Sequence, residues 1–366
     1  MRFPEFSGEW KSHQIKEIAS IVGGGTPDTN VKEYWAGDIN WYTPSEIGKT
    51  KYVNRSIRRI SHFGVDNSSA KILPKGTILL STRATIGEKS ITETECCTNQ
   101  GFQSVIPNVH TDTNFCYYAL DGVKSEMIRR ASGSTFLEIS SSQLSSIHFR
   151  LPDIREQRKI GLFLSLIDER IETQSKIIEE QETLLKSLAD KLFSQNIHSC
   201  QLSELVDIIK GKQLNAVNFS EEGDFYVMNG GITPSGYYSE YNVPAGVISI
   251  SEGGNSCGYV QFNEEPFWSG GHCYSLRSKN TIVDYKYIYY FLKAKQTDVM
   301  ALRIGSGLPN IQKKDIERFT VSFPPLQQQK QFVNALDAVS AKIDTEKRLL
   351  EKYRQQKDYL LSRMFI

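Results

Sequence analysis

The sequence predicts an α+β protein in which two α/β domains, related by a pseudo-two-fold axis, are separated by an antiparallel coiled coil of two long helices. Three observations predict this fold. The second half of the chain repeats the first, each half carries short strand-like segments between Gly- and Asn-rich stretches, and each half ends in a long amphipathic segment without proline.

The internal repeat is read from identical residues at one spacing. Pro152, Gln157, Ile171 and Phe193 recur 172 residues later as Pro324, Gln329, Ile343 and Phe365. Upstream the spacing drifts to 170 and then 187 residues, so the tail of each copy is fixed while its head varies. Two copies are too few for a solenoid, and a duplicated frame that carries two variable heads is expected instead.

Composition bounds the class of protein. The 366 residues, 39% hydrophobic and 23% charged, can bury two ordinary cores, and no apolar run approaches the ~20 residues of a membrane span. The start of the chain has no signal-peptide core, so a cytoplasmic protein is expected, and its six cysteines form no CxxC pair and are expected to be reduced thiols. A formal charge of +1 argues against gripping nucleic acid by bulk charge, so any DNA binding must depend on local patches or on a partner.

In chain order, the first domain is expected over residues 1–153, with strands near 39–42, 77–81 and 102–106 and a helix over 115–131. The second domain is expected over 197–323, with strands near 225–228, 247–251 and 273–276 and a helix over 284–301. Gly- and Asn-rich clusters between the strands predict irregular, exposed loops.

Each domain is followed by a helical spacer, over 154–196 and 324–366, whose heptad pattern runs over 156–193 and 328–365. Each pattern continues for 38 residues, about 57 Å as a helix, which is too long to be covered by a domain of this size. The two segments are therefore expected to pack on each other, and the order of the chain makes them antiparallel. Lys357 interrupts the apolar seam, whose members are expected at 160, 164, 167, 171, 178, 185, 188 and 192 and at Leu336, Val339, Ile343, Leu350, Tyr353, Leu360 and Met364.

The nucleotide-triphosphate loop, the HExxH motif and the base-flipping methyltransferase motif are missing from the sequence. At the spacing that a nucleotide-triphosphate loop requires, no Gly-Lys-Ser/Thr follows Gly23-Gly24-Gly25-Thr26, and no HExxH occurs. The single Pro-Pro, at Pro324-Pro325, lacks the flanking residues of a base-flipping methyltransferase motif. The chain is expected not to be an enzyme and to hold no metal.

One family shares the whole pattern. Gly24-Gly25-Thr26-Pro27, Tyr34-Trp35, Trp41-Tyr42-Thr43-Pro44, and Leu151-Pro152 before a helical segment that ends Lys191-Leu192-Phe193 resemble the specificity subunit of type I restriction-modification systems. The second half lacks the Gly-Gly-Thr-Pro and Tyr-Trp elements and has Lys210-Gly211-Lys212-Gln213 instead. The resemblance implies two target-recognition domains that each read one half of a bipartite, asymmetric DNA sequence, with two helical spacers between them.

The resemblance also implies partners: double-stranded DNA, two methyltransferase subunits that use S-adenosylmethionine, and translocase-nuclease subunits. No cofactor is expected on the chain itself. Candidate docking residues lie in the polar first turn of each helical segment, where they would otherwise act as helix caps: Glu156, Gln157, Arg158, Gln328, Gln329 and Lys330.

Candidate DNA-binding residues lie in the loops that differ between the halves. Arg83 suits guanine, Asn255 suits adenine and Glu252 suits the amino group of cytosine, although each is equally well read as a locally bonded loop residue. Trp41 is read as a packing residue before a base-stacking one, and Arg303 and Lys313, like Arg129-Arg130, as phosphate contacts or solvated cations. The remaining candidates are Gly24, Thr26, Thr82, Thr85, Asn99, Gln100, Lys212, Asn229 and His272.

Two other functions stay open at this point. The chain could be a coiled-coil scaffold that joins two domains binding protein or sugar, or a DNA methyltransferase or nuclease that acts alone. DNA binding that depends on assembly with a methyltransferase would distinguish a specificity subunit from a scaffold and from an enzyme that acts alone.

Overall fold

The computed structural model describes residues 2–133, 137–194, 198–215, 219–279, 281–305, 307 and 309–365. It divides into two compact units, each of which holds part of both long helices. Unit 1 comprises residues 1–175 and 348–366, and unit 2 comprises residues 176–347.

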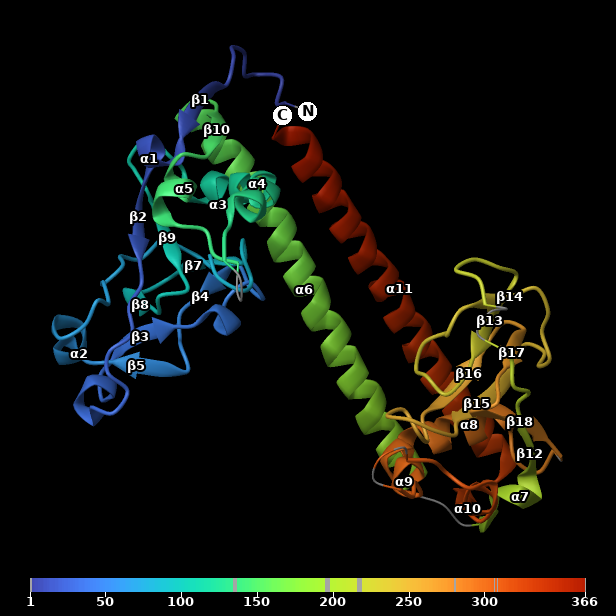
Figure 1. Ribbon diagram of the computed structural model, residues 1–366. Helices are drawn as coiled ribbons and strands as arrows, with labels where there is room; N and C mark the ends of the chain where they lie inside the picture. Colours follow the sequence, from blue (N-terminus) through green and yellow to red (C-terminus); the bar gives the residue numbers. More distant parts are fainter. Residues whose placement is uncertain are drawn as a thin grey trace. The chain divides into compact units, whose positions relative to one another are not determined.

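Unit 1 is built on three small sheets (Figure 1). β1 (Lys11–Gln14) pairs with β10 (His148–Leu151). The five-stranded sheet has the order β2 (Ala19–Gly23), β9 (Gln103–Pro107), β6 (Ile78–Leu80), β7 (Lys89–Thr92), β4 (Tyr52–Val53). The three-stranded sheet has the order β5 (Arg58–Ile60), β3 (Ile39–Tyr42), β8 (Cys96–Thr98).

Short helices connect these strands in unit 1. Figure 1 shows α3 and α4 beside the first part of α6, and Phe115 and Tyr118 of α3 share a buried core with Ile160 and Leu164 of α6. The short helices are α1 (Ile15–Ile18), η1 (Lys32–Trp35), η2 (Pro44–Glu46), α2 (His62–Asp66), α3 (Thr113–Gly122), α4 (Lys124–Arg130) and α5 (Ser141–Ser145).

Unit 2 repeats this plan. β11 (His198–Gln201) pairs with β19 (Thr320–Phe323), as β1 does with β10. The larger sheet has the order β12 (Val206–Lys210), β18 (Cys273–Ser278), β15 (Val247–Ser251), β16 (Val260–Asn263), and the smaller one the order β14 (Tyr237–Tyr238), β13 (Phe225–Met228), β17 (Phe267–Ser269). The central strand of each smaller sheet has one parallel neighbour, β8 for β3 and β17 for β13, so the duplication extends to strand direction. Its helices are α7 (Leu202–Leu205), α8 (Tyr285–Ala294), α9 (Gln296–Ala301) and α10 (Lys313–Glu317).

The two long helices are α6 (Ile154–Phe193) and α11 (Leu326–Met364), and they pack antiparallel. In unit 1, Lys357 of α11 lies 2.7 Å from Asp168, and Tyr353 lies under Arg170, so the numbers fall along α11 as they rise along α6. In unit 2, Lys347 lies 2.6 Å from Glu182. The expected seam positions are buried or half-buried, which confirms the heptad pattern. Two α/β domains with an antiparallel helix pair are thus confirmed.

Two details differ from the sequence prediction. The helices expected over 115–131 and 284–301 are each two helices, interrupted at Val123 and Lys295. Both residues leave helical geometry, with ψ angles of 4° and 22°, and they stand at equivalent positions of the repeat. The interruption is therefore a feature of the duplicated frame, and each second helix turns back onto its own core through Met127 or Val299.

Candidate nucleic-acid interface

In unit 1 the loops after β2 and β8 are held together by close backbone contact. A Cβ on Gly24 would lie 1.9 Å from the carbonyl oxygen of Asn99, so only glycine fits there. The hydroxyl of Thr26 donates to the side-chain oxygen of Gln100, and the Asn99 side chain accepts from the backbone N–H of Gly101. The structure therefore brings together four residues that the sequence singled out separately.

The loop after β6 presents only part of its predicted set. Arg83 and Thr85 are exposed, and the Arg83 guanidinium lies 3.9 Å from the Glu138 carboxylate. Thr82 is buried, and its backbone N–H donates to the Gly101 carbonyl. Ala84 adopts a φ of 63°, which makes the sharp turn that points Arg83 outward. Arg83 and Thr85 can meet a ligand at this surface, whereas Thr82 fastens the loop.

Trp41 is a packing residue. Its ring is 3% exposed, its indole N–H donates to the Gly25 carbonyl at 2.9 Å, and it meets Trp35 edge-to-face. No base can stack on a ring enclosed in this way. Trp41 serves the interface by holding the Gly24 loop in place.

In unit 2, the loop after β15 corresponds to the loop after β6 in unit 1, and it carries a buried carboxylate. Glu252 is only 9% exposed, and its Oε1 accepts from the Lys210 ammonium at 2.7 Å and the Tyr274 hydroxyl at 3.0 Å. Burial, and then the hydrogen bond to Glu252, raise the pKa of Tyr274. Oε2 of Glu252 has no hydrogen-bond partner among the described residues and lies 3.7 Å from Nδ1 of His272.

His272 stands at the surface of this loop group. Its side chain is exposed, and its backbone N–H donates to the side-chain oxygen of Asn229 at 3.1 Å. Asn255 and Lys212 are exposed on neighbouring loops, and Lys212 holds the indole N–H of Trp268 with its carbonyl oxygen. Glu252 thus lies behind His272, so we expect His272 and Asn255 to be the side chains that a ligand would meet at this surface.

The predicted cations have separate surroundings. Arg303 is exposed just after α9, and Lys313 is exposed at the start of α10, 3.6 Å from Glu317. Arg129 is exposed, whereas Arg130 is engaged by Glu126 and Ser146. Gly133-Ser134-Thr135 recurs 172 residues later in the sequence as Gly305-Ser306-Gly307, and Ser134, Thr135 and Ser306 lie outside the described part of the chain.

A glutamine in the first turn of each long helix makes the same three hydrogen bonds in both units. Gln157 accepts from the N–H of Asp112 and donates to the carbonyls of Pro152 and His110. Gln329 accepts from the N–H of Asp284 and donates to the carbonyls of Pro324 and Ile282, each 172 residues on. Both glutamines are buried, so they clamp helix to domain and cannot dock a partner.

The other predicted docking residues differ in their exposure. Glu156 is buried and is bound through both oxygens by the guanidinium of Arg2, at 2.7 and 2.6 Å. Arg158 and Lys330, which are equivalent in the repeat, are exposed, and Gln328 is half-buried. The exposed cations are the members of the set that a partner could reach.

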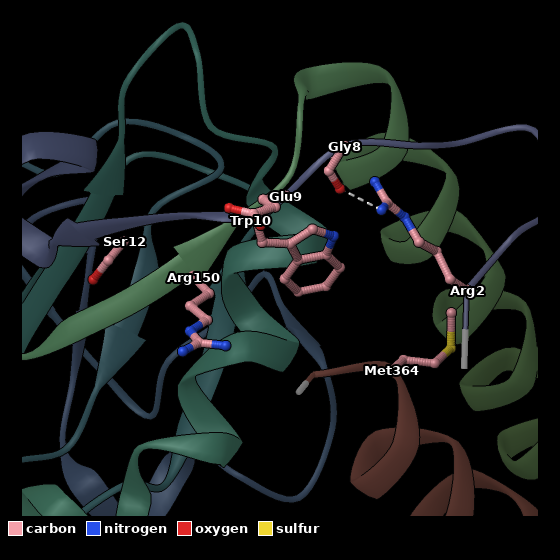
Figure 2. Close-up of a pocket in the computed structure, with 7 residues that line it drawn as sticks. All are labelled: Arg2, Gly8, Glu9, Trp10, Ser12, Arg150 and Met364. Atoms are coloured by element: carbon pink, nitrogen blue, oxygen red, sulfur yellow. Dashed lines mark hydrogen bonds between the residues drawn. The ribbon is translucent and has the colours of Figure 1, made fainter.

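A hollow of about 780 Å³ lies near the start of α6 in unit 1. Figure 2 shows Trp10, Arg150 and Met364 around it, and Arg2 turned toward the carbonyl of Gly8. Indole, guanidinium and thioether groups gathered at one surface are typical of protein–protein contacts.

The described residues meet neither the requirements of a metal site nor those of a membrane-spanning helix, and the cysteines do not meet those of a disulfide. No group of His, Cys, Asp and Glu there could hold a metal ion. All six cysteines are free, and burial raises the pKa of the Cys97 and Cys116 thiols to about 12. No described helix is long and apolar enough to cross a membrane.

Two features of unit 1 were missed in the sequence. Lys51 is wedged between Tyr118 and Ser165 beside α6, and burial lowers its pKa to about 8. Arg55, Arg58 and Arg59 are exposed on one short segment. The dense spacing of these arginines was visible in the sequence and could have indicated a basic patch.

Comparison with known proteins gives the family. A family model described as the type I restriction modification DNA specificity domain matches residues 7–183 and again 195–353. The specificity subunit of the type I restriction enzyme MjaIX from Methanocaldococcus jannaschii is 39% identical over 189 residues, which are 50% of this chain and 43% of that protein. The chain thus spans less than half the length of that relative. The EcoprrI specificity subunit of Escherichia coli is 22% identical over 88% of this chain and 86% of its own length.

Solved structures share the fold along the whole chain. The type I S subunit of Mycoplasma genitalium matches with a TM-score of 0.70 at 23% identity, covering 100% of this chain and 99% of that one. A chain from a structure on complex assembly of the type I restriction-modification system matches with a TM-score of 0.60 at 16% identity, covering 99% and 98%. With both halves matched by one family model, the chain belongs to the type I restriction-modification DNA specificity family.

Proposed function

We propose that this chain is the DNA sequence-specificity subunit of a type I restriction-modification complex. Each domain reads one half of a bipartite, asymmetric target, and the two long helices set the spacer and dock the methyltransferase subunits. The reading domains are residues 1–153 and 197–323, and the spacers are residues 154–196 and 324–366. The chain itself is non-catalytic, and partner subunits methylate and cleave.

One observation supports this proposal above the rest. Apart from β4, which the larger sheet of unit 2 lacks, the two units share strand order, strand direction and the glutamine clamp, yet they differ in the loops that face outward. Unit 1 presents Arg83, Thr85 and Gln100, whereas unit 2 presents Asn255 and His272. Different donor and acceptor groups on one frame suit two different half-sequences.

Membership of the same family supports the proposed partners. Two copies of a methyltransferase subunit would find equivalent exposed cations at Arg158 and Lys330. The hollow beside Trp10 and Arg150 is a docking surface of suitable chemistry. Translocase-nuclease subunits would complete the restriction complex, and S-adenosylmethionine would bind to the methyltransferase.

The test is a gel shift on a pool of random duplexes, with the full chain alone and with its type I methyltransferase. Selection and sequencing of the bound duplexes should return two short fixed sequences with an unspecified spacer between them. A bound pool with no enriched sequence would refute the proposal, as would methyltransferase binding without any effect on DNA binding.

A further inference from the structure

One exposed segment of unit 1 combines positive charge with an apolar tip. Residues 54–59, here called the arginine loop, comprise the connection from β4 to β5 and the first two residues of β5, and they carry Arg55, Arg58 and Arg59, all exposed. Ile57 lies between them and is 86% exposed, a fraction that only Val109 equals among the exposed large hydrophobic residues described. An isoleucine held in water gains none of the free energy of burial, so its position needs another reason.

The exposure is not a consequence of a loose loop, because buried polar groups fix its backbone. The Asn40 side chain, itself buried, donates to the Asn54 carbonyl at 2.9 Å and accepts from the Ser56 N–H at 3.1 Å. The Glu46 carboxylate accepts from the N–H of Ile57 itself at 2.7 Å. These hydrogen bonds therefore fix the backbone in a conformation that keeps Ile57 exposed.

The arginines are available for a ligand. None of the three forms an ion pair with a carboxylate in the described residues. The Arg58 guanidinium lies over the Trp35 ring at 3.4 Å from its centroid, which orients the group while its N–H edges stay free. Because Arg58 and Arg59 are consecutive residues of strand β5, their side chains leave it on opposite faces.

Unit 2 has no counterpart to this charge. From Gln213 to Leu276, which includes β13, β14 and β17, the sequence contains neither lysine nor arginine. The acidic residues of that stretch are Glu221, Glu222, Asp224, Glu240, Glu252, Glu264 and Glu265. The smaller sheet of unit 2 cannot neutralise phosphates with its own side chains, although it occupies the same place in the repeat.

We propose that the arginine loop is a DNA-contacting element, through which unit 1 supplies the phosphate grip that the second domain lacks. Arg55 and Arg59 bind phosphates of a double-stranded duplex on either side of a groove, and Ile57 packs on apolar base or sugar surface within it. Arg58, steadied by Trp35, adds a third cation. This inference rests on the proposed DNA-reading function and assigns it a site.

The first test measures how binding to random-sequence duplexes depends on salt, using the full chain assembled with its methyltransferase. Each lost phosphate contact reduces the slope of log K against log[salt] by about 0.9, so R55Q/R59Q should lower the slope by about 2. The control, K11Q/K16Q, removes the same charge from exposed lysines of β1 and α1, at the other end of unit 1 in Figure 1, and should leave the slope unchanged.

The second test separates the apolar tip from the charge. Ile57→Ser should weaken binding about fivefold to tenfold without changing the salt slope, since an apolar contact releases no counterions. Val109→Ser, at a site of equal exposure in the same unit, should have no effect on affinity.

The outcomes are distinguishable. If the unaltered assembly binds no duplex at all, the proposed function fails. If it binds and R55Q/R59Q keeps the original slope, the arginine loop is not a phosphate contact and the inference is overturned. If R55Q/R59Q instead prevents co-purification of the methyltransferase, the surface is a protein interface and the inference is likewise overturned.

Discussion

At the scale of single residues, the duplication of the sequence is a duplication of contacts. Gln157 and Gln329 are identical because each satisfies one N–H and two carbonyl groups that stand at the same places in its unit. Buried backbone groups without partners are costly, so a change at either glutamine would orphan several of them at once.

Gln157→Ala should therefore lower the free energy of unfolding by about 2–4 kcal/mol, and Gln329→Ala by a similar amount. The measurement is urea denaturation followed by circular dichroism. Arg158→Ala, one residue along the same helix and exposed, serves as the control and should change stability by less than about 0.5 kcal/mol. Equal effects of Gln157→Ala and Arg158→Ala would show that the clamp contributes nothing.

The lowered pKa of Lys51 should make the free energy of unfolding depend on pH. Burial lowers its pKa to about 8 from the ordinary 10.5, and the hydroxyl of Tyr118 and that of Ser165 accept from its ammonium. Between these values the unfolded chain holds more protons than the folded one, so the contribution of Lys51 to stability rises with pH. The cost of burying the ammonium is fully present below pH 8.

Lys51→Met removes this titration. We expect the stability of the variant relative to the unaltered chain to be highest near pH 7 and to fall as the pH rises to 9.5, measured by denaturation at a series of pH values. A difference between the two proteins that stays constant over this range would contradict the assignment of a lowered pKa.

The sequence could not predict the direction in which individual side chains point. The sequence identified the loops that carry Thr82 and Glu252, but not which way each of these two side chains points. Ser81, Thr82 and Trp41 turn inward because the loops of unit 1 bond to one another, and such contacts join residues far apart in the chain. Tertiary packing therefore decided between readings that composition left open.

At the scale of elements, the long helices were the most predictable part of the molecule. A heptad pattern repeats a local signal many times, so the extent of α6 and α11 and their antiparallel packing could be inferred without a structure. Short strands such as β4, with two residues, carry too little pattern to be found and depend on their neighbours in the sheet.

The interruption of the seam at Lys357 has a structural reason. The Lys357 ammonium lies 2.7 Å from the Asp168 carboxylate, which also accepts from the Tyr118 hydroxyl at 2.6 Å. In unit 2 the equivalent positions are Leu185 and Ser340, and Tyr290 donates to Asp337 instead. The aspartate that accepts from the tyrosine therefore stands at a different position of the long helix in each unit, while the tyrosine–aspartate hydrogen bond is retained.

Lys357→Leu should destabilise unit 1 by about 1–3 kcal/mol, because it leaves the half-buried Asp168 carboxylate without its cation. The double change K357L/D168S, which puts the residues of unit 2 at these two positions, should recover part of that loss. Denaturation of the two single variants and the double variant completes a double-mutant cycle. Strictly additive effects would show that the pair is not coupled.

At the scale of the whole molecule, a fixed frame that carries two different sets of loops accounts for the sequence pattern. The tail of the repeat keeps one spacing because the helices and the clamp must fit, whereas the head drifts because the loops differ. The bases read by each head do not follow from residue type alone, since one exposed side chain can pair with more than one base edge.

If the helices set the spacer, deleting one heptad from both should shorten the unspecified part of the target and leave both half-sequences unchanged. Selection of bound duplexes by the shortened assembly measures this directly. Retention of the original spacer by a folded, DNA-binding variant would refute the role of the helices in spacing.

The central claim is that each domain reads its own half of the target. The most direct measurement replaces residues 1–150 with the corresponding domain of another specificity subunit and maps N6-methylated adenines across the genome of cells that carry the chimera. The account predicts that one half of the methylated sequence changes and the other half stays as it was. A change in both halves would contradict it.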